Sequence, residues 1–296
     1  MSTGLYYEHS GKYDTGGLMT SLLGGIAGAV ALSFAYAYLL LYIPLAGYVT
    51  LILTGGYGFL LALMMGFLLK RGKVRNTGAA IGVTLLVALV GLYSSWVVWI
   101  YALPRREEME ADLLSLFLQP GAVWNIISFV NGTGAWTIRN WTPTGTTLWF
   151  FWGLEAAIIL GVAAFFTLGI VVKDPFCEGC GTWCEETEGV ARLGQADGAE
   201  LKQHLESRDF AYLEKLGPAM ADAPGYVEIN VHSCMNCRGT HTVSANLVTV
   251  TVNKKGESEA SKETVVDKLL VDSSGADAVR GIGQKLAPAA GFAPAK

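Results

Sequence analysis

The residues with the clearest chemistry in this chain are four cysteines arranged as two Cys-x-x-Cys pairs, Cys177 with Cys180 and Cys234 with Cys237. A tight turn that carries such a pair points two sulfurs to one side, and two such turns complete a tetrahedral four-sulfur site. Structural zinc sites are built in this way and keep no open coordination position. We therefore predict one structural zinc ion held by these four cysteines.

Two other chemistries remain open for the same pairs. A rubredoxin-like iron site is compatible with Gly181 directly after Cys180, but the second pair lacks the Pro-x-Cys-Gly form and the insertion between the pairs is long. Thiol–disulfide exchange requires a lowered thiol pKa, typically at a helix N-terminus. Neither pair opens an expected helix, so both chemistries rank below zinc.

Cys184 is the fifth cysteine, and an odd count fits disulfide pairing poorly. We favour a free buried thiol for Cys184 over its use as an alternative ligand. His232 and His241 lie close to the second pair and could ligate, but we expect both to face solvent from strands, and we expect His204 to be exposed on a helix. The chain has no Gly-rich phosphate loop, His-Glu-x-x-His motif or nucleophile elbow, so the sequence does not indicate an enzyme.

Hydrophobic residues make up 52% of the chain, and its mean hydropathy is positive, which indicates a membrane protein. A helix needs about 20 apolar residues to cross the ~30 Å hydrocarbon layer. Four segments meet this length: Leu18–Ile43, Leu45–Leu69, Thr77–Leu103 and Leu148–Val172. The first is too long for a signal-peptide core and follows little positive charge, so we predict a retained span.

The loop Lys70–Arg75 between the second and third spans carries four cations in six residues. Because short cytoplasmic loops are enriched in Lys and Arg, this loop and both termini should be cytoplasmic and the segment 104–147 should lie outside. Seven of the eight tryptophans fall between positions 96 and 152, which fits an aromatic belt at the outer interface. Two amphipathic helices in this outer segment, Glu107–Leu118 and Ala122–Asn131, should lie along the membrane surface or dock a partner.

Small residues recur in the spans at spacings that allow helices to approach closely. We expect them to hold the bundle together, with homo-oligomerisation as a hypothesis. They are Gly24, Gly28, Gly55, Gly58, Gly66, Gly78 and Gly82.

Glu155 is the ionisable residue inside the predicted spans. A carboxylate at this depth is costly and is therefore a functional candidate. Ser94 and Ser95 of the third span lie at a matching depth, so we favour structural hydrogen bonding over proton or cation handling.

After Val172 the pattern changes to that of an α+β domain. The apolar spacing predicts a helix over Gly198–Leu216 and a last helix over Gly275–Leu286. Alternating residues predict strands over Tyr226–Val231, Thr240–Asn253 and Glu263–Val271. From Lys173 onward there are 13 basic and 18 acidic residues, and an acidic domain does not fit nucleic-acid binding.

The fold class that follows is an α-helical transmembrane bundle of four spans plus a small zinc-ribbon-like α+β domain in the cytoplasm. The predicted parts are a cytoplasmic N-terminal segment (1–17), the transmembrane domain (18–172) with outer interfacial helices inside 104–147, the metal-binding domain (173–286) and a disordered tail (287–296). Because the cytoplasm is reducing, its thiols bind metal more often than they form disulfides.

Several stretches resemble a family of uncharacterised bacterial multi-pass membrane proteins: Tyr7–Tyr13, Leu69–Asn76, Gly134–Trp136 with Trp152–Glu155, and Pro175–Cys180 with a later Cys-x-x-Cys pair. The resemblance covers most of the chain and implies a bacterial inner-membrane setting but no function. It also implies that Cys177, Cys180, Cys234 and Cys237 are the shared cysteines, whereas Cys184 departs from the pattern.

The role these features predict is interaction or scaffolding. A lipid-embedded anchor would present a zinc-stabilised domain to a protein partner or to a second copy of the chain. The alternative is a subunit of a membrane redox or transport complex that uses Glu155 or the Cys-x-x-Cys thiols directly.

Overall fold

The structure, a computed structural model, describes residues 4–43, 48–103, 112–137, 140–220, 223–252 and 258–286. The chain divides into two compact units, with boundaries after Ser10 and after Lys173. One unit is helical and covers the middle of the sequence. The other combines the N-terminal residues with everything that follows residue 173. The predicted tail, 287–296, lies outside the described residues.

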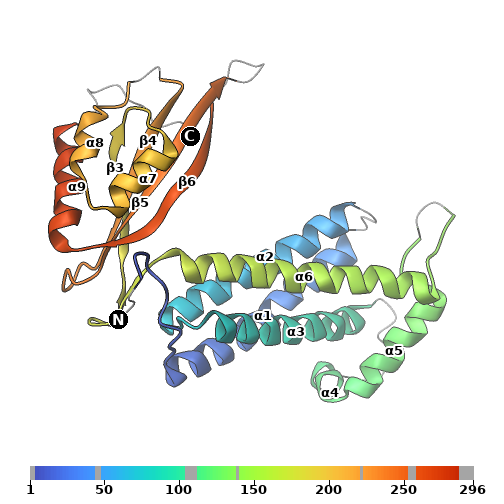
Figure 1. Cartoon of the computed structure of the whole chain (residues 1–296). Helices are drawn as coiled ribbons and strands as arrows, with labels where there is room; N and C mark the ends of the chain where they lie inside the picture. Colours follow the sequence, from blue (N-terminus) through green and yellow to red (C-terminus); the bar gives the residue numbers. More distant parts are fainter. Residues whose placement is uncertain are drawn as a thin grey trace. The chain divides into compact units, whose positions relative to one another are not determined.

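Within the described part of the helical unit, four helices are long and apolar enough to cross a membrane, as the hydrophobic runs predict (Figure 1). The first begins three residues earlier than expected because the Asp14 side chain accepts a hydrogen bond from the Gly17 amide (2.7 Å) and caps the helix. Asn76 caps the third in the same way. The helices are α1 (Thr15–Tyr42), α2 (Tyr48–Arg71), α3 (Thr77–Ala102) and α6 (Gly145–Lys173).

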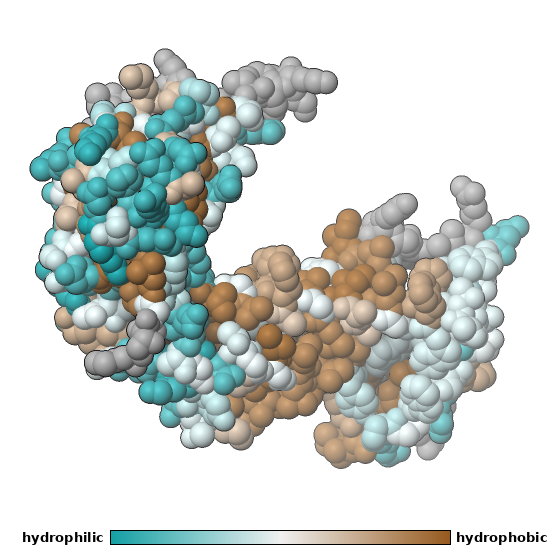
Figure 2. Space-filling view, viewed as in Figure 1, coloured by the Kyte–Doolittle hydropathy of each residue, from teal (hydrophilic) through white to brown (hydrophobic). Residues whose placement is uncertain are grey.

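The outer surface of these helices is apolar. Large side chains such as Ile52, Phe67 and Phe165 are at least 63% exposed. In Figure 2 hydrophobic residues cover much of the visible face of the helical unit. Water does not favour so much exposed apolar surface, whereas lipid tails do. The chain therefore has the helices and the surface of a multi-pass membrane protein.

Glycines allow α2 to lie directly against α6. A Cβ atom on Gly58 would stand 2.9 Å from the Ile159 carbonyl oxygen, and one on Gly66 would stand 2.7 Å from Ile170 Cγ2. These two glycines pack the bundle as the sequence predicts. By contrast, Gly55 and Gly82 have no described atom within 4 Å of such a Cβ.

Two short helices follow α3 along the chain. Residues 104–111, which hold the start of the predicted helix Glu107–Leu118, lie outside the described residues, and the rest of that helix is α4 (Leu113–Leu118). The second is α5 (Pro120–Thr133), which ends at Gly134 with φ +94°. They share an apolar cluster with the end of α3: Val97, Ile100, Leu116, Val123 and Ile127.

The other unit is built on a four-stranded antiparallel sheet in the order β3-β4-β5-β6. A separate small hairpin, β1 and β2, precedes it, and three helices complete the α+β unit. The strands are β1 (Phe176–Cys177), β2 (Thr182–Trp183), β3 (Glu185–Leu193), β4 (Gly225–Ser233), β5 (His241–Val252) and β6 (Ser258–Val271). The helices are α7 (Gly198–Glu206), α8 (Ala211–Lys215) and α9 (Ser273–Lys285).

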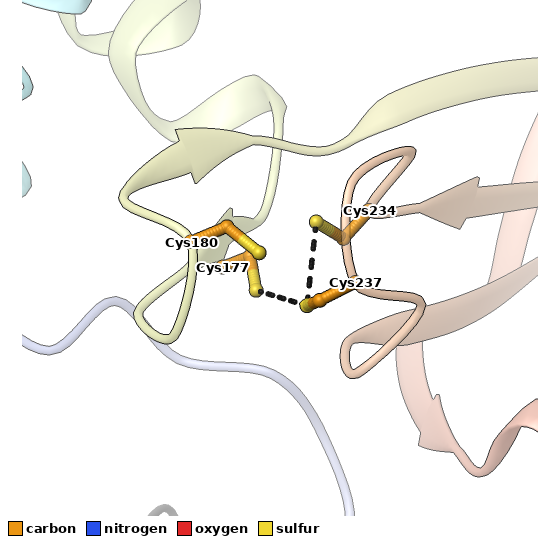
Figure 3. Close-up of side chains that lie close together, drawn as sticks. All are labelled: Cys177, Cys180, Cys234 and Cys237. Carbon is orange, nitrogen blue, oxygen red and sulfur yellow. Dashed lines mark hydrogen bonds between the residues drawn. The ribbon is translucent and has the colours of Figure 1, made fainter.

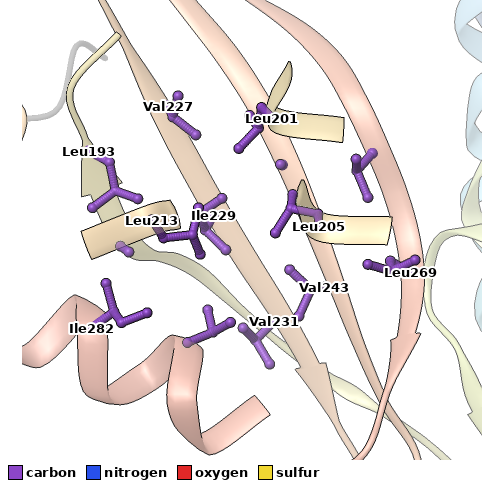
Figure 4. Close-up of a cluster of buried hydrophobic side chains, with 14 of the residues drawn as sticks. Leu193, Leu201, Leu205, Leu213, Val227, Ile229, Val231, Val243, Leu269 and Ile282 are labelled. Carbon is purple, nitrogen blue, oxygen red and sulfur yellow. The ribbon is translucent and has the colours of Figure 1, made fainter. Parts of the chain in front are cut away.

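Alternate residues of the sheet form the apolar core. Val227, Ile229 and Val231 of β4 point to the face that the three helices cover (Figure 4). Leu205 of α7 and Ile282 of α9 pack onto this face, and both are at most 5% exposed. The alternation that predicts β4 and β5 therefore also determines which face becomes the core.

Two features of this unit differ from the sequence-based expectation. β3 is not predicted, because its acidic sequence lacks apolar alternation and a bulge at Gly189 (φ +60°) interrupts its pairing. The single helix predicted over Gly198–Leu216 is two helices. Arg208 adopts φ +63° and the Asp209 amide donates to the His204 carbonyl (2.9 Å), which ends α7 in a left-handed cap.

The N-terminal segment belongs to the sheet unit and pairs with the edge of β6. The Leu270 amide donates to the Leu5 carbonyl (3.0 Å), and the Tyr7 amide donates to the Lys268 carbonyl (2.9 Å). Tyr6 forms a bridge with Leu269 between them. Both ends of the sequence therefore contribute to one folded unit.

We expect Gly58→Ala to destabilise the helical unit by about 1–3 kcal/mol, because the added methyl group meets backbone atoms of α6. Gly55→Ala, three residues earlier on α2, is the matched control. It should be neutral or stabilising by up to about 1 kcal/mol, because alanine favours a helix more than glycine does. Thermal unfolding of both variants in detergent measures the difference, and equal stabilities would contradict the close packing of α2 on α6.

Candidate metal centre

The two Cys-x-x-Cys pairs occupy two turns of the same design. The first turn joins β1 to β2, and the second joins β4 to β5. In each, the residue after the second cysteine is left-handed: Gly181 with φ +63° and Arg238 with φ +51°. The amides of these residues donate to the carbonyls of Cys177 (2.8 Å) and Cys234 (3.2 Å). This geometry directs both sulfurs of each pair out of the turn.

Strand pairing brings the two turns together. β3 begins one residue after the β1–β2 hairpin that carries the first turn, and β4 ends directly before the second turn. Because the two strands are antiparallel, with Glu185 opposite Ser233, the start of β3 lies beside the end of β4. Cysteines that are more than fifty positions apart in the sequence thus become neighbours.

All four sulfurs lie within 4.8 Å of one another (Figure 3). The Sγ atoms of Cys177 and Cys237 are 3.5 Å apart, and those of Cys234 and Cys237 are 3.8 Å apart. A tetrahedral ion with metal–sulfur bonds of ~2.3 Å separates its sulfurs by about 3.8 Å. The cysteines are free thiols, with no disulfide among them. The four side chains can therefore hold one metal ion with little rearrangement.

The electrostatics of the cluster divide the thiols into two kinds. Burial raises the pKa of Cys234, but amides of its own turn, at Cys237 and Asn236, outweigh burial and lower the pKa to about 6. The pKa of Cys177 is also lowered by hydrogen bonds that outweigh its burial. Cys180 is the opposite case, because hydrogen bonding with Cys237 first and burial second raise its pKa to about 12. Cys234 is therefore ready to bind as a thiolate, whereas Cys180 must lose its proton on metal binding.

Cys184 lies beside this cluster but outside the four-sulfur group. Its side chain is 3% exposed, and its sulfur is 4.0 Å from the Thr240 carbonyl oxygen. Burial and the negative charge of the neighbouring thiolates raise the pKa of Cys184 to about 12. These surroundings are those of a neutral buried thiol.

His241 supports the second turn, and the expectation that it faces solvent is wrong. It is 3% exposed, its Nε2 donates to the Arg238 carbonyl (2.7 Å), and its Nδ1 lies 2.8 Å from Ser233 Oγ. Ser233 also accepts a hydrogen bond from Arg280 of α9. Because both ring nitrogens are engaged, His241 holds the turn and is not placed to ligate a metal.

The other two histidines also differ from expectation. His232 is 3% exposed and therefore buried, and its Nε2 lies 3.8 Å from Glu186 Oε2. His204 is half-buried because its ring stacks on Tyr212, with ring centroids 4.1 Å apart. Periodicity alone gives no sign of the His204 burial, because its partners Asp209 and Tyr212 follow the break at Arg208, which helical spacing does not predict.

The N-terminal segment also contacts the first turn. The Phe176 amide donates to the Tyr7 hydroxyl (2.8 Å), and the Ser10 hydroxyl donates to the Glu178 carboxylate (2.6 Å). His9 packs against Trp183, with ring centroids 6.0 Å apart. The residues before the first span therefore help to shape the metal centre.

Glu155 lies in α6 and does not form the hydrogen bonds predicted with Ser94 and Ser95. Those serines instead donate to carbonyls of their own helix, at Val90 and Leu92, each at 2.7 Å. Glu155 lines a cavity of about 620 Å³ in the helical unit. Five tryptophans line the same cavity: Trp96, Trp99, Trp136, Trp141 and Trp152.

No protein-family model matches the chain, and neither a curated protein nor a solved structure shows a significant match to it. The geometry of the cysteine cluster is therefore the main guide to function.

We expect Cys180→Ser to lower zinc affinity by more than about 100-fold, because a hydroxyl replaces one of four thiolate ligands. Cys184→Ser should keep zinc affinity within about threefold, because Cys184 lies outside the four-sulfur group. Competition with a chromophoric chelator measures both affinities. If the Cys184 variant lost zinc and the Cys180 variant kept it, Cys184 would be the fourth ligand and Cys180 would not.

Zinc affinity should decrease as the pH is lowered through about 6. Cys234, with its pKa of about 6, is ionised at pH 7 and takes up a proton as the pH falls below about 6. Cys180, with its pKa of about 12, must release a proton when the ion binds at pH 7. Chelator competition between pH 5 and pH 8 and proton release in weak buffer measure both effects. A pH-independent affinity would contradict ligation by thiolates.

Proposed function

We propose that this protein is an integral membrane scaffold whose zinc-ribbon-like C-terminal unit is held together by one structural zinc ion and binds a protein partner. The observation that carries the proposal is the approach of four free thiols to within 4.8 Å of one another on two similar turns. Four thiolates fill the tetrahedral shell of zinc, so no position remains for a substrate. A closed site of this kind stabilises a fold.

The zinc ion would join the β1–β2 hairpin to the turn between β4 and β5. The β1–β2 hairpin pairs with no strand of the four-stranded sheet. A metal ion that binds Cys177 and Cys180 on this hairpin, and Cys234 and Cys237 on the sheet, would fix one to the other. Removal of the ion should therefore loosen the hairpin more than the apolar core.

Cytoplasmic placement of the zinc unit is part of the proposal. Because residues 4–10 and 174–286 form one unit, both must lie on the same side of a membrane, which requires an even number of crossings. Four candidate helices satisfy this condition. The basic loop Lys70–Arg75 favours the cytoplasm for that side, and the resemblance given above favours a bacterial inner membrane.

The partner would be a protein or a second copy of the chain rather than nucleic acid. The segment from Lys173 onward has 13 basic and 18 acidic residues, so it lacks the excess of cations that phosphate binding needs. Crosslinking in native membranes separates homo-oligomers from complexes with other proteins.

Metal analysis tests the scaffold proposal. Purified protein should contain one zinc ion per chain and show no visible absorption. A variant with both Cys177→Ser and Cys180→Ser should lose the ion and any bound partner, while Cys184→Ser, the matched control, should keep both. Iron colour, or thiols that exchange with disulfides in the purified protein, would overturn the proposal.

The orientation is tested with reporters fused to the C-terminus. A green fluorescent protein fusion should fluoresce, and an alkaline phosphatase fusion should be inactive, because the first folds in the cytoplasm and the second requires an oxidising compartment. Phosphatase activity with no fluorescence would place the thiols outside and refute the cytoplasmic zinc unit.

A second candidate function is a redox or transport subunit that uses Glu155 directly, and the cavity is the observation that favours it. Its volume of about 620 Å³ is that of a small-molecule site. One carboxylate among tryptophan rings suits an organic cation, which is attracted both by the charge and by the ring faces.

Tryptophan fluorescence can test this second function. Tetraphenylphosphonium should quench the fluorescence of the wild type saturably, whereas Glu155→Gln should weaken its binding at least tenfold. Triphenylphosphine oxide, a neutral relative, should bind both proteins equally and serves as the control for hydrophobic partition. Equal cation binding by wild type and variant would leave Glu155 with a structural role only.

A further inference from the structure

The face of the sheet opposite the apolar core is polar, yet its central residues are buried. Six polar side chains alternate with the core residues along the two central strands, and each is at most 8% exposed. They are Glu228, Asn230 and His232 of β4, and Thr242, Ser244 and Asn246 of β5. Buried polar groups of this kind are expected to have hydrogen-bond partners.

Four of the six have such partners. Glu228 accepts a hydrogen bond from Lys262 (2.5 Å), and Asn230 binds both the Gly189 amide (2.8 Å) and Glu186 (3.2 Å). The Ser244 hydroxyl accepts from the Lys268 amide (2.9 Å), and Asn246 accepts from Thr264 (2.8 Å). Most of this face is thus a satisfied network.

His232 and Thr242 are the exceptions. The two ring nitrogens of His232 and the hydroxyl oxygen of Thr242 have no hydrogen-bond partner among the described residues. The two residues lie directly opposite each other in the β4–β5 pairing. Leaving a buried polar group unsatisfied costs about 1–3 kcal/mol, so two such groups side by side indicate a ligand at this point.

Two carboxylates approach the same point. Glu186 lies opposite His232 in the β3–β4 pairing, with Oε2 3.8 Å from His232 Nε2. Asp174, at the start of the unit, brings a carboxylate oxygen to within 4.8 Å of ligand atoms of both. The Asn230 side chain donates to Glu186 Oε1 (3.2 Å) and so orients the carboxylate, as outer residues do at metal sites.

From this arrangement we propose a second metal site, formed by Asp174, Glu186 and His232, that binds a divalent first-row cation such as Mn²⁺. One imidazole and two carboxylates form a mixed nitrogen–oxygen set, which suits manganese, iron or zinc better than the all-oxygen cations calcium and magnesium. Two ligand atoms bound to one such ion lie about 4.2 Å apart at most. Three ligand atoms on one ion cannot all be this far apart, and neighbouring pairs lie about 3.0–3.4 Å from each other, so pairs now up to 4.8 Å apart need to close by about 1–2 Å.

The proposed site differs from the four-cysteine centre in chemistry. Its three protein ligands leave coordination positions for water or a small ligand, as at catalytic metals, whereas four thiolates leave none. Thr242, opposite His232 in the β4–β5 pairing, has an unsatisfied hydroxyl, and we assign that hydroxyl to such a water. This inference goes beyond the proposed scaffold function, and its test rests on that function only in using zinc to fill the cysteine site first.

Lys268 offers a competing explanation for the two carboxylates. Its side chain is 18% exposed, and it acts electrostatically on His232 together with Asp174 and Glu186. In that case the lysine neutralises the carboxylates, and no cation is needed. Measurement of cation binding decides between the two arrangements.

The test uses full-length protein in detergent, loaded with one equivalent of zinc so that the tighter four-thiolate site is filled. Electron paramagnetic resonance of free Mn²⁺ then measures manganese binding. Wild type should bind one Mn²⁺ per chain. Asp174→Asn and His232→Gln should each weaken binding at least tenfold, and so should Glu186→Gln, whereas Glu185→Gln should not change it. Glu185 is the matched control, because it is the adjacent carboxylate on β3 and points to the other side of the strand.

Loss of zinc from the cysteine site would report that a variant fails to fold. A second measurement uses the wild type alone and remains decisive in that case. Electron spin-echo modulation of Mn²⁺ bound to wild type should show coupling to one imidazole nitrogen. Absence of that coupling, absence of saturable binding, or equal weakening by Glu185→Gln would overturn the site and leave a polar cluster neutralised by Lys268.

Discussion

The pairing of β3 with β4 is the interaction on which the rest of the sheet unit depends. It places Glu185 opposite Ser233, and so brings the β1–β2 hairpin, which carries the first cysteine turn, to the start of the second turn. The register is fixed by the core, because a slip of one residue would turn Val227, Ile229 and Val231 away from the helices. Apolar burial on one face thus positions the sulfur chemistry at the end of the same strands.

The two faces of the sheet have different tasks. The helix-covered face supplies the free energy of burial, whereas the opposite face holds a polar network whose members fix one another's orientation. Glu186 links the sulfur cluster to the polar face of the sheet. It lies two residues after Cys184 and accepts a hydrogen bond from Asn230. A displacement of β3 would therefore alter the geometry of both the sulfur cluster and the polar face.

The sequence predicts the parts of this protein that follow a simple local pattern of residue types. Apolar length predicts the four long helices, alternation predicts β4 to β6, and Cys-x-x-Cys spacing predicts that four thiols meet. It does not predict β3, because the acidic sequence of this strand lacks apolar alternation. It also does not predict the break at Arg208, where a left-handed residue ends a helix. Nor does it predict the burial of His232 and His241, because their contacts with Glu186 and Ser233 arise only when the strands pair.

The pairing of Leu5, Tyr6 and Tyr7 with β6 makes the sheet unit discontinuous, and the four long apolar helices of the described chain are inserted between its two segments. During synthesis the first residues emerge well before β6, so the sheet edge stays open until translation is nearly complete. A soluble fragment that starts at Asp174 would keep this edge unpaired, and unpaired edges promote aggregation. A fragment in which Gly4–Ser10 is joined to Asp174 through a flexible linker would retain the missing strand and is the better choice for isolating this unit.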